Sequence, residues 1–323
     1  MPQLRAEFLV AGAGPSGLTI ARLLALKGRG VVVVDPGPSA AGRLELLAPA
    51  ALGTVDALGL SSLLSNPAIA RPCLGIRRWW DSGQPEHEDF LRHPRRTGHV
   101  VDRASFDRSL RDAAAAAGVV FVEARVTGLV EGGVRLAIGR GVSETLAFGG
   151  TLIDATGRVA MVARRKGARI AIRDRRVAEL IEESALHSDS VAPVWLDVRK
   201  HDETSWSYRI EGPVGKVQIW RIRKPGTATA PDALRRVDSS ASILTEMAGE
   251  SWLAVGDAAC AFDPIASQGL FNALSSALVS AGALQVSGRL TCDAARAYSG
   301  AVAAAFLFSE AGRSQVYRGR GTT

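Results

Sequence analysis

The sequence has few of the residues that build metal sites or disulfides. Its three cysteines, Cys73, Cys260 and Cys292, lie far apart and do not have metal-ligand spacing. An odd, scattered set of this kind predicts reduced thiols. The five histidines also lack ligand spacing, and no nucleophile–base pair stands out. We therefore expect no metal site and no catalysis by a side-chain nucleophile.

Long apolar runs are also absent. No stretch approaches the roughly 20 residues that span a bilayer, and no leader pattern precedes the first predicted strand. Hydrophobic residues make up 47% of the 323 residues and charged residues 22%, which is ordinary for a globular protein. We expect one large domain or two coupled ones, a cytoplasmic location and no membrane partner.

The chain has fewer acidic than basic residues, 32 against 39, so its formal net charge is +7. One interpretation is an anionic partner, either a nucleic acid or an acidic protein surface. The other is arginine on solvated faces and on cofactor phosphates. No basic run is interleaved with aromatic residues, as a nucleic-acid platform would be. This favours the second interpretation and predicts no nucleic-acid partner.

The strongest local signal lies near the N-terminus. A predicted strand at residues 7–11 leads into Gly12-Ala13-Gly14-Pro15-Ser16-Gly17, which opens a predicted helix at residues 16–27. In such a turn the first glycine allows the tight bend and the second lets the backbone approach a pyrophosphate. The third lets helix and strand pack closely, and the helix N-terminus then faces the phosphates.

A carboxylate completes this unit. The run Val31–Val34 is typical of a parallel strand buried on both faces, and it ends at Asp35, 18 residues after Gly17. An acid at this place accepts hydrogen bonds from the adenosine ribose and would repel the 2′-phosphate of NADP. The unit therefore predicts a dinucleotide site that disfavours NADP.

The rest of the chain predicts further helices and strands. Residues 36–49 predict a loop containing Arg43, and residues 49–58 predict a helix. Residues 170–250 contain alternating stretches that indicate an antiparallel sheet bearing several aromatic residues. Either these form a substrate wall, or they pack on the buried face of an amphipathic sheet, and the second interpretation is favoured. The same two interpretations apply to Trp79 and Trp80, where packing is again favoured.

A second motif lies near the C-terminus. Residues 251–255 predict a strand, which leads through Gly256-Asp257 and a loop containing Pro264 and Gln268 into a helix beginning at Gly269-Leu270. A carboxylate just past a strand can bind a polyol, and a helix N-terminus can stabilise negative charge.

Three segments together resemble the fingerprints of FAD-dependent monooxygenases of the aromatic-hydroxylase type and of their halogenase relatives. They are Gly12–Gly17 with Asp35, Asp154-Ala155-Thr156-Gly157, and Gly256-Asp257 with Pro264. Residues 101–110, 154–168 and 256–269 look most like a narrower group, the flavoproteins of quinone-cofactor maturation related to LodB, GoxB and QhpG. Members of that group are associated with oxidising a tryptophan inside a partner protein.

The resemblance implies an α/β fold with a Rossmann-like FAD-binding domain on a parallel sheet, of the glutathione-reductase-2-like type. This domain would comprise residues 1–170 and 250–323, and an antiparallel substrate region would comprise residues 71–100 and 171–249. The residues implied to bind FAD are Gly12, Gly14, Pro15, Ser16, Gly17, Asp35, Arg43, Arg103, Asp154, Gly157, Gly256, Asp257, Gly269 and Leu270. Pro264, Gln268 and Gly269 would lie beside the reacting ring. For Arg43 and Arg103 a surface salt bridge is the alternative.

The implied activity is an FAD-dependent monooxygenase that uses O₂ to hydroxylate an aromatic ring through a flavin C4a-hydroperoxide. The substrate would be a tryptophan of a partner protein, or else a small aromatic compound. No second nucleotide fingerprint is present, so NAD(P)H would dock transiently or a separate flavin reductase would supply electrons. A flavin-binding scaffold and an isoprenoid-type reductase are the alternatives. Halogenation is disfavoured, because no lysine lies between Lys27 and Lys166 and the halogenase Trp-x-Trp-x-Ile-Pro motif is missing.

Overall fold

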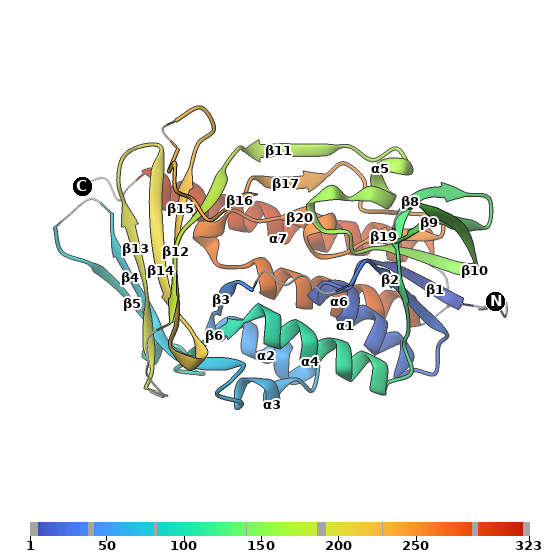
Figure 1. Cartoon of the computed structure of the whole chain (residues 1–323), viewed down its shortest axis with the longest axis horizontal. Coiled ribbons are helices and arrows are strands. Elements are labelled where there is room, and N and C mark those ends of the chain that lie inside the picture. The colour runs from blue at the N-terminus through green and yellow to red at the C-terminus, as the bar shows by residue number, and fades with distance from the viewer. Residues whose placement is uncertain are drawn as a thin grey trace.

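The structure, a computed structural model, describes residues 6–37, 42–80, 83–139, 141–185, 192–227, 229–285 and 290–318. Three sheets and several helices make up the fold (Figure 1). The N-terminal sheet lies at one end of the molecule, and a nine-stranded sheet stands at the other. In the described part of the chain no helix is both long and apolar enough to cross a bilayer.

The N-terminal sheet has a parallel centre. Its strand order is β18-β19-β10-β1-β2-β7, and β8 and β9 form a hairpin that continues into β10. Neighbours from β19 to β7 run parallel. The bounds are β1 Ala6–Ala11, β2 Val31–Asp35, β7 Val120–Glu123, β8 Arg125–Val130, β9 Gly133–Ile138, β10 Val142–Asp154, β18 Ala248–Gly249 and β19 Trp252–Ala254.

Helices cover the faces of this sheet and seal its core. Helix α1 packs against both α4 and α6. The strand run Val31–Val34 is buried throughout, as its position inside a parallel sheet requires. The helix bounds are α1 Pro15–Ala25, α2 Leu52–Ala57, α3 Ser61–Leu64, α4 Arg103–Ala116, α5 Met161–Arg165, α6 Gly269–Gln285 and α7 Cys292–Arg318.

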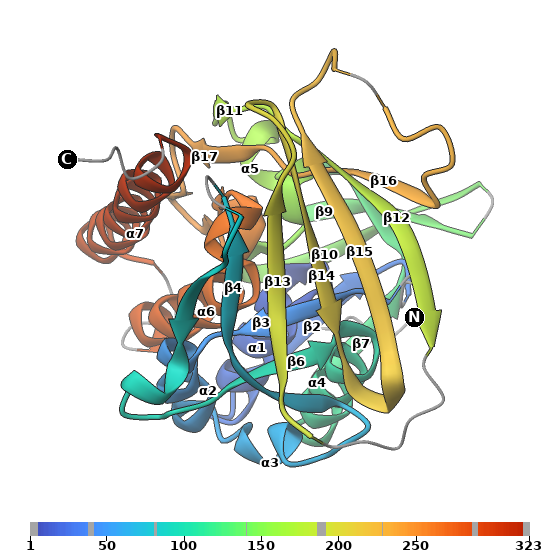
Figure 2. The ribbon, with the colours of Figure 1, turned by 90° about the vertical axis from the view of Figure 1, so that its left-hand side faces the viewer.

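The nine-stranded sheet is antiparallel except where β13 runs parallel to β4. Its order is β16-β12-β15-β14-β13-β4-β6-β3, with β5 beside β4, and Figure 2 shows the sheet with its face toward the viewer. The bounds are β3 Leu44–Leu47, β4 Ala70–Trp79, β5 Glu86–Asp89, β6 Gly98–Asp102, β12 Val177–Ala185, β13 Val194–Lys200, β14 Ser205–Glu211, β15 Lys216–Arg223 and β16 Arg235–Asp238. Most of its strands come from residues 71–100 and 171–249, whose assignment to a separate domain stays a prediction.

A small third sheet joins the two larger ones. Its order is β11-β17-β20, with bounds β11 Ile170–Asp174, β17 Ala241–Leu244 and β20 Cys260–Ala261. It lies along the top of the molecule in Figure 1, next to α5. Because β20 follows the Gly256-Asp257 turn directly, this sheet ties the second motif to the strands that lead into the nine-stranded sheet.

Two details differ from the sequence predictions. The predicted loop at residues 36–49 contains strand β3, because Leu44, Leu46 and Leu47 are buried and pair with β6. Residues 38–41 of that loop lie outside the described residues. The predicted helix at residues 49–58 begins as a 3₁₀ turn at Pro49–Ala51 before α2.

The cysteines offer a direct test of this packing. Burial raises the pKa of the Cys73 thiol to about 11 and that of Cys260 to about 12, whereas Cys292 is exposed at the start of α7. Because the thiolate is the reactive form, we expect iodoacetamide at about pH 8 to modify only Cys292 in the native protein. Mass spectrometry should show one adduct natively and three after denaturation. Rapid native labelling of Cys260 would contradict the described core.

Candidate active site

Three segments that are far apart in the sequence meet at the start of α1. Gly12 has a φ of +106°, and a Cβ on it would lie 2.3 Å from the carbonyl oxygen of Ala155. A Cβ on Gly17 would lie 2.1 Å from the carbonyl oxygen of Gly12, and one on Gly256 would lie 2.6 Å from Ser16 Oγ. The contacts leave no room for side chains at these glycines, so the three fingerprints form one packed unit.

Gly14 differs from these glycines, because a Cβ there would meet nothing within 4 Å. It precedes α1, whose N-terminus has no side-chain cap and begins with Pro15. The unpaired N–H groups of a helix start attract an anion, and the open space at Gly14 lets a phosphate come close to the backbone. These residues therefore fit the pyrophosphate of FAD.

Asp35 holds the turn in place from the end of β2. Its Oδ2 accepts a hydrogen bond of 2.8 Å from the Ala13 N–H, and its Oδ1 accepts one of 2.9 Å from the Gly37 N–H. A carboxylate has about four lone-pair sites, so further acceptor capacity remains for ribose hydroxyls. This position fits the predicted role, which stays a prediction.

Asp154 is buried and does not line the cavity described below, and its role in cofactor binding stays a prediction. The residue has no exposed surface. Its Oδ1 accepts bonds from the Thr156 N–H at 3.0 Å and hydroxyl at 2.6 Å, and its Oδ2 accepts one from the Ala163 N–H at 2.8 Å. Burial raises the pKa of Asp154. Its carboxylate holds the turn at Ala155–Gly157, which packs on the N-terminal fingerprint, and the role of Gly157 stays a prediction.

Arg43 and Arg103 share one carboxylate but face different surroundings. Glu45 accepts a bond from Arg43 Nη2 and one of 2.7 Å from Arg103 Nη1. Burial raises the pKa of Glu45, but the two guanidinium groups outweigh it and leave that pKa below its usual value. Arg103 also makes two bonds of 2.9 Å to Asp107. Arg103 is therefore paired with acids on both sides, whereas Arg43 borders an open cavity. The predicted contact of each arginine with the flavin stays a prediction.

That cavity lies between the nine-stranded sheet and the second fingerprint. Five predicted residues line it: Arg43, Asp257, Pro264, Gln268 and Gly269. Leu270, the next residue, is 2% exposed and packs into the core. Arg103 lies at the start of α4, bonded to Glu45 beside the cavity. The other predicted residues cluster at the start of α1 or next to it, so the structure divides the candidate set between a dinucleotide turn and a cavity.

One wall of the cavity is aromatic. Trp206, Tyr208 and Trp220 line it together with aliphatic residues of β13, β14 and β15. Trp206 is 2% exposed and Trp220 1%, so both residues serve as core and as wall. Trp79 and Trp80 do not line the cavity. Trp80 packs behind Trp206, with ring centroids 6.4 Å apart, which agrees with the packing interpretation.

The polar edge of the cavity carries charges of both signs. Arg158 Nε lies 3.6 Å from Asp257 Oδ2. Burial raises the pKa of Asp257, and the charges of Arg158 and Arg43 oppose this rise. Arg158 also donates a hydrogen bond to the carbonyl oxygen of Ser240. A substrate or cofactor group at this edge would therefore meet two guanidinium groups close to one carboxylate.

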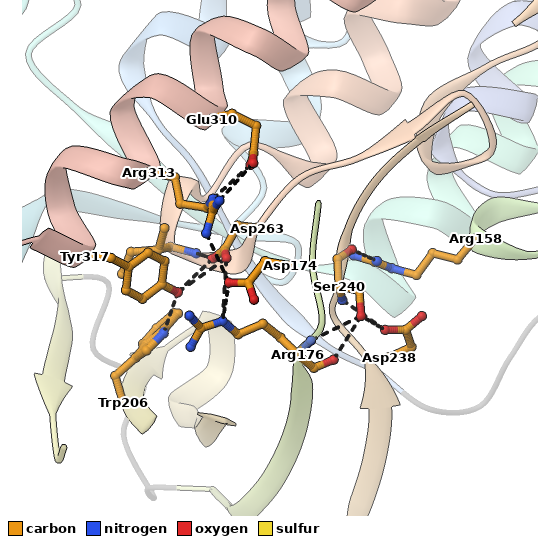
Figure 3. Close-up of polar contacts among 11 residues, drawn as sticks. Arg158, Asp174, Arg176, Trp206, Asp238, Ser240, Asp263, Glu310, Arg313 and Tyr317 are labelled. Atoms are coloured by element: carbon orange, nitrogen blue, oxygen red, sulfur yellow. Dashed lines mark hydrogen bonds and ion pairs between the residues drawn. The ribbon is translucent and has the colours of Figure 1, made fainter. Parts of the chain in front are cut away.

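A buried polar network borders the cavity through Trp206 and Asp263 (Figure 3). The Tyr317 hydroxyl accepts a bond of 2.9 Å from Trp206 Nε1 and donates one of 3.1 Å to Asp263 Oδ1, which also accepts the Ile265 N–H at 2.9 Å. The Arg176 guanidinium lies 4.4 Å from the Tyr317 ring centroid. The network thereby connects the end of α7, the segment around Pro264 and the aromatic wall.

Sequence reasoning named neither Asp263, Tyr317 nor Arg158 as a site residue. Asp263 directly precedes Pro264, and Arg158 directly follows Gly157, so proximity to a motif was an available signal for both. Tyr317 lies 54 residues from Asp263, and no local pattern connects them. Only the packing of α7 brings this tyrosine to Trp206 and Asp263, which line the cavity.

Known proteins match part of this sequence and the fold of the chain. Residues 5–134 match the family model described as FAD binding domain. The flavin-dependent brominase Bmp2 has a similar structure, with a TM-score of 0.79 and 18% identity over 93% of this chain and 84% of the brominase. P. aeruginosa PqsL, solved in complex with 2-aminobenzoylacetate, has a TM-score of 0.73 and 20% identity over 95% of this chain and 93% of its own.

A third similar structure is the peptidyl tryptophan dihydroxylase QhpG, with a TM-score of 0.71 and 25% identity over 94% of this chain and 72% of its own. No curated protein matches the sequence. The predictions of fold and of FAD are confirmed. The chain is therefore an FAD-dependent oxidoreductase, in which residues 5–134 form an FAD binding domain and the whole has the fold of flavin-dependent monooxygenases and halogenases.

Proposed function

We propose that the protein is a monooxygenase that hydroxylates a tryptophan side chain of a partner polypeptide. The aromatic cavity carries this proposal. Its walls of Trp206, Tyr208 and Trp220 suit a flat ring, and its other side is formed by Asp257 and the segment around Pro264. Ring–ring contacts of this kind favour aromatic ligands. The likeness to QhpG, a peptidyl tryptophan dihydroxylase, favours tryptophan as the ring.

The chain's own residues would bind, orient and shield the reactants. The start of α1 would hold the pyrophosphate, Asp35 the ribose and Asp257 the ribityl chain, while the N-terminus of α6 offers a positive dipole end. When bound, FAD supplies the redox chemistry: two electrons to O₂, of which one atom enters the ring and the other leaves as water with two protons. The apolar wall would exclude water from the reacting ring.

The electrons would come from NAD(P)H docking transiently or from a separate flavin reductase. A small aromatic compound is the second candidate substrate, supported by the likeness to PqsL, which was solved with 2-aminobenzoylacetate. A cytoplasmic setting is part of the proposal, and the three unpaired cysteines support it.

The proposal is tested by supplying the FAD-loaded, reduced enzyme with O₂ and either a tryptophan-containing peptide or a free aromatic compound. We expect oxygen uptake that depends on the peptide, and a mass gain of one or two oxygen atoms on tryptophan. Oxidation of only the free compound would favour the second candidate. If oxygen uptake is the same with and without every aromatic substrate, the assignment as a monooxygenase is contradicted.

Asp35→Ala tests the adenosine half of the site. Loss of a charge-assisted hydrogen bond should weaken FAD binding about tenfold, measured as flavin retained after gel filtration and as a dissociation constant. Asp112→Ala, at an exposed acid on α4, is the matched control and should retain FAD fully. Unchanged flavin content in Asp35→Ala would refute the ribose assignment.

A further inference from the structure

Most of the chain's net positive charge lies in one short segment. Residues 164–176 contain seven basic residues and one acid, so they carry +6 of the formal +7. The segment comprises the end of α5 and all of β11, along the top of the molecule in Figure 1. Since the rest of the chain is close to neutral, this face has a positive potential of its own.

The arginines of this segment face solvent. Arg164, Arg165, Arg169, Arg173 and Arg175 are all exposed. The one acid in the segment is Asp174. Its Oδ2 forms ion pairs with Arg176 Nε at 2.9 Å and with Arg313 Nη1 at 3.0 Å, inside the buried network. In the ranges that the structure describes, the five exposed arginines form no ion pair. Their charge is therefore available to an external anion.

Three of these five arginines border a groove that adjoins the cavity. Arg158, Arg164, Arg165 and Arg169 line the groove, and Ile170 and Ile172 form its apolar part. Arg158 and Asp238 line the groove and the aromatic cavity alike. Asp238 accepts bonds of 2.9 and 2.6 Å from the Ser240 N–H and hydroxyl, and Figure 3 shows it beside Arg158. A ligand in the groove would thus reach the edge of the cavity at Arg158 and Asp238.

The shape and composition of the groove favour a polypeptide. The groove lies over one face of the small sheet, since Ile172 of β11 and Ser242 of β17 pair with each other and both line it. In the described sheets β11 pairs only with β17, so its other edge is also open, and exposed edges bind extended peptides. The residues lining the groove include no aromatic side chain, whereas single-stranded nucleic acids bind on aromatic stacking platforms. Apolar contacts to Ile170 and Ile172 suit alternate side chains of an extended segment.

We propose that this basic groove binds an acidic stretch of polypeptide next to the residue that is oxidised in the cavity. The inference rests on the proposed function, since it requires that the oxidised ring belong to a polypeptide. The positive charge would raise the association rate and select acidic sequences on one side of the tryptophan.

The test uses the FAD-loaded enzyme and a fluorescent peptide of about 15 residues, long enough to span the groove and the cavity in extended form, with a central tryptophan flanked by glutamates. The variant Arg164→Glu/Arg169→Glu reverses two exposed charges of the groove. The control Arg92→Glu/Arg108→Glu reverses two exposed arginines elsewhere. We expect the groove variant to raise the dissociation constant of the acidic peptide at least tenfold, about 1.4 kcal/mol, and the control to leave it unchanged.

A peptide with lysines in place of the glutamates should bind the unmodified enzyme weakly and the groove variant more tightly. Equal binding of the acidic peptide to the groove variant and the unmodified enzyme would overturn the inference. The inference would also be overturned if the groove variant lost affinity only for NADPH or for an oligonucleotide and not for the acidic peptide. Oxidation of tryptophan at saturating peptide is measured separately. Oxidation without a preference for acidic peptides would contradict only the inference about the groove. Preferential binding of acidic peptides without oxidation would contradict only the proposed function.

Discussion

Gly14→Val is expected to abolish FAD binding while the apoprotein keeps its fold. A Cβ at this position meets nothing within 4 Å in the protein, and Gly14 has a φ of −73°, which any residue adopts. The substitution should therefore leave the thermal midpoint of the apoprotein unchanged. The added side chain would occupy the space through which the pyrophosphate approaches the start of α1. The purified variant should be colourless and should not take up added FAD.

Gly17→Ala is the matched contrast, because here the protein itself fills the space. The new Cβ would lie 2.1 Å from the Gly12 carbonyl oxygen, and relieving that contact requires α1 to move away from β1. We expect a loss of about 2–3 kcal/mol in the free energy of unfolding. Retention of FAD by Gly14→Val would show that the pyrophosphate lies elsewhere.

Asp263→Ala is the second substitution with a large expected effect. Asp263 is 2% exposed and accepts bonds from the Ile265 N–H and the Tyr317 hydroxyl, with Arg176 Nε 4.0 Å away. Removing the carboxylate leaves these buried groups without their acceptor, which should cost about 3 kcal/mol of stability. Because Asp263 fixes the segment that begins at Pro264, we also expect turnover to fall at least tenfold with FAD content unchanged.

Asp263→Asn separates the carboxylate's shape from its charge. The amide oxygen of asparagine can still accept from the Ile265 N–H, so this variant should recover most of the stability. Tyr317→Phe should behave differently, because it leaves Trp206 Nε1 without its acceptor while Asp263 keeps the Ile265 bond. Normal stability and turnover of Asp263→Ala would mean that the network does not position the cavity.

The sequence was most informative where function and local geometry coincide. The turn from Gly12 to Gly17 and the valine run ending at Asp35 could be predicted, because close approach and burial on both faces restrict residue choice at each position. Strand β3 could not be predicted, because its four residues lie in a segment rich in glycine, proline and alanine. Their pairing with β6, across about 55 residues, makes them a strand.

In the candidate site, too, features that depend on contacts between distant residues could not be predicted from the sequence. Asp154 belongs to a fingerprint, and its burial and its bonds to the turn at Thr156 could not be predicted, because sequence alone does not distinguish a ligand contact from a buried support. The network of Trp206, Asp263 and Tyr317 depends on contacts between residues up to 111 apart. The groove could be seen only as an excess of charge, because its adjacency to the cavity follows from the fold around Arg158.

The most direct test of the central claim is the origin of the oxygen in the product. The FAD-loaded, reduced enzyme is mixed with a tryptophan peptide and with O₂ labelled with the heavy oxygen isotope, and the product is analysed by mass spectrometry. We predict that tryptophan gains labelled oxygen and that the gain is lost in Gly14→Val. Unlabelled oxygen in the product, or release of all the label as peroxide and water, would contradict the monooxygenase.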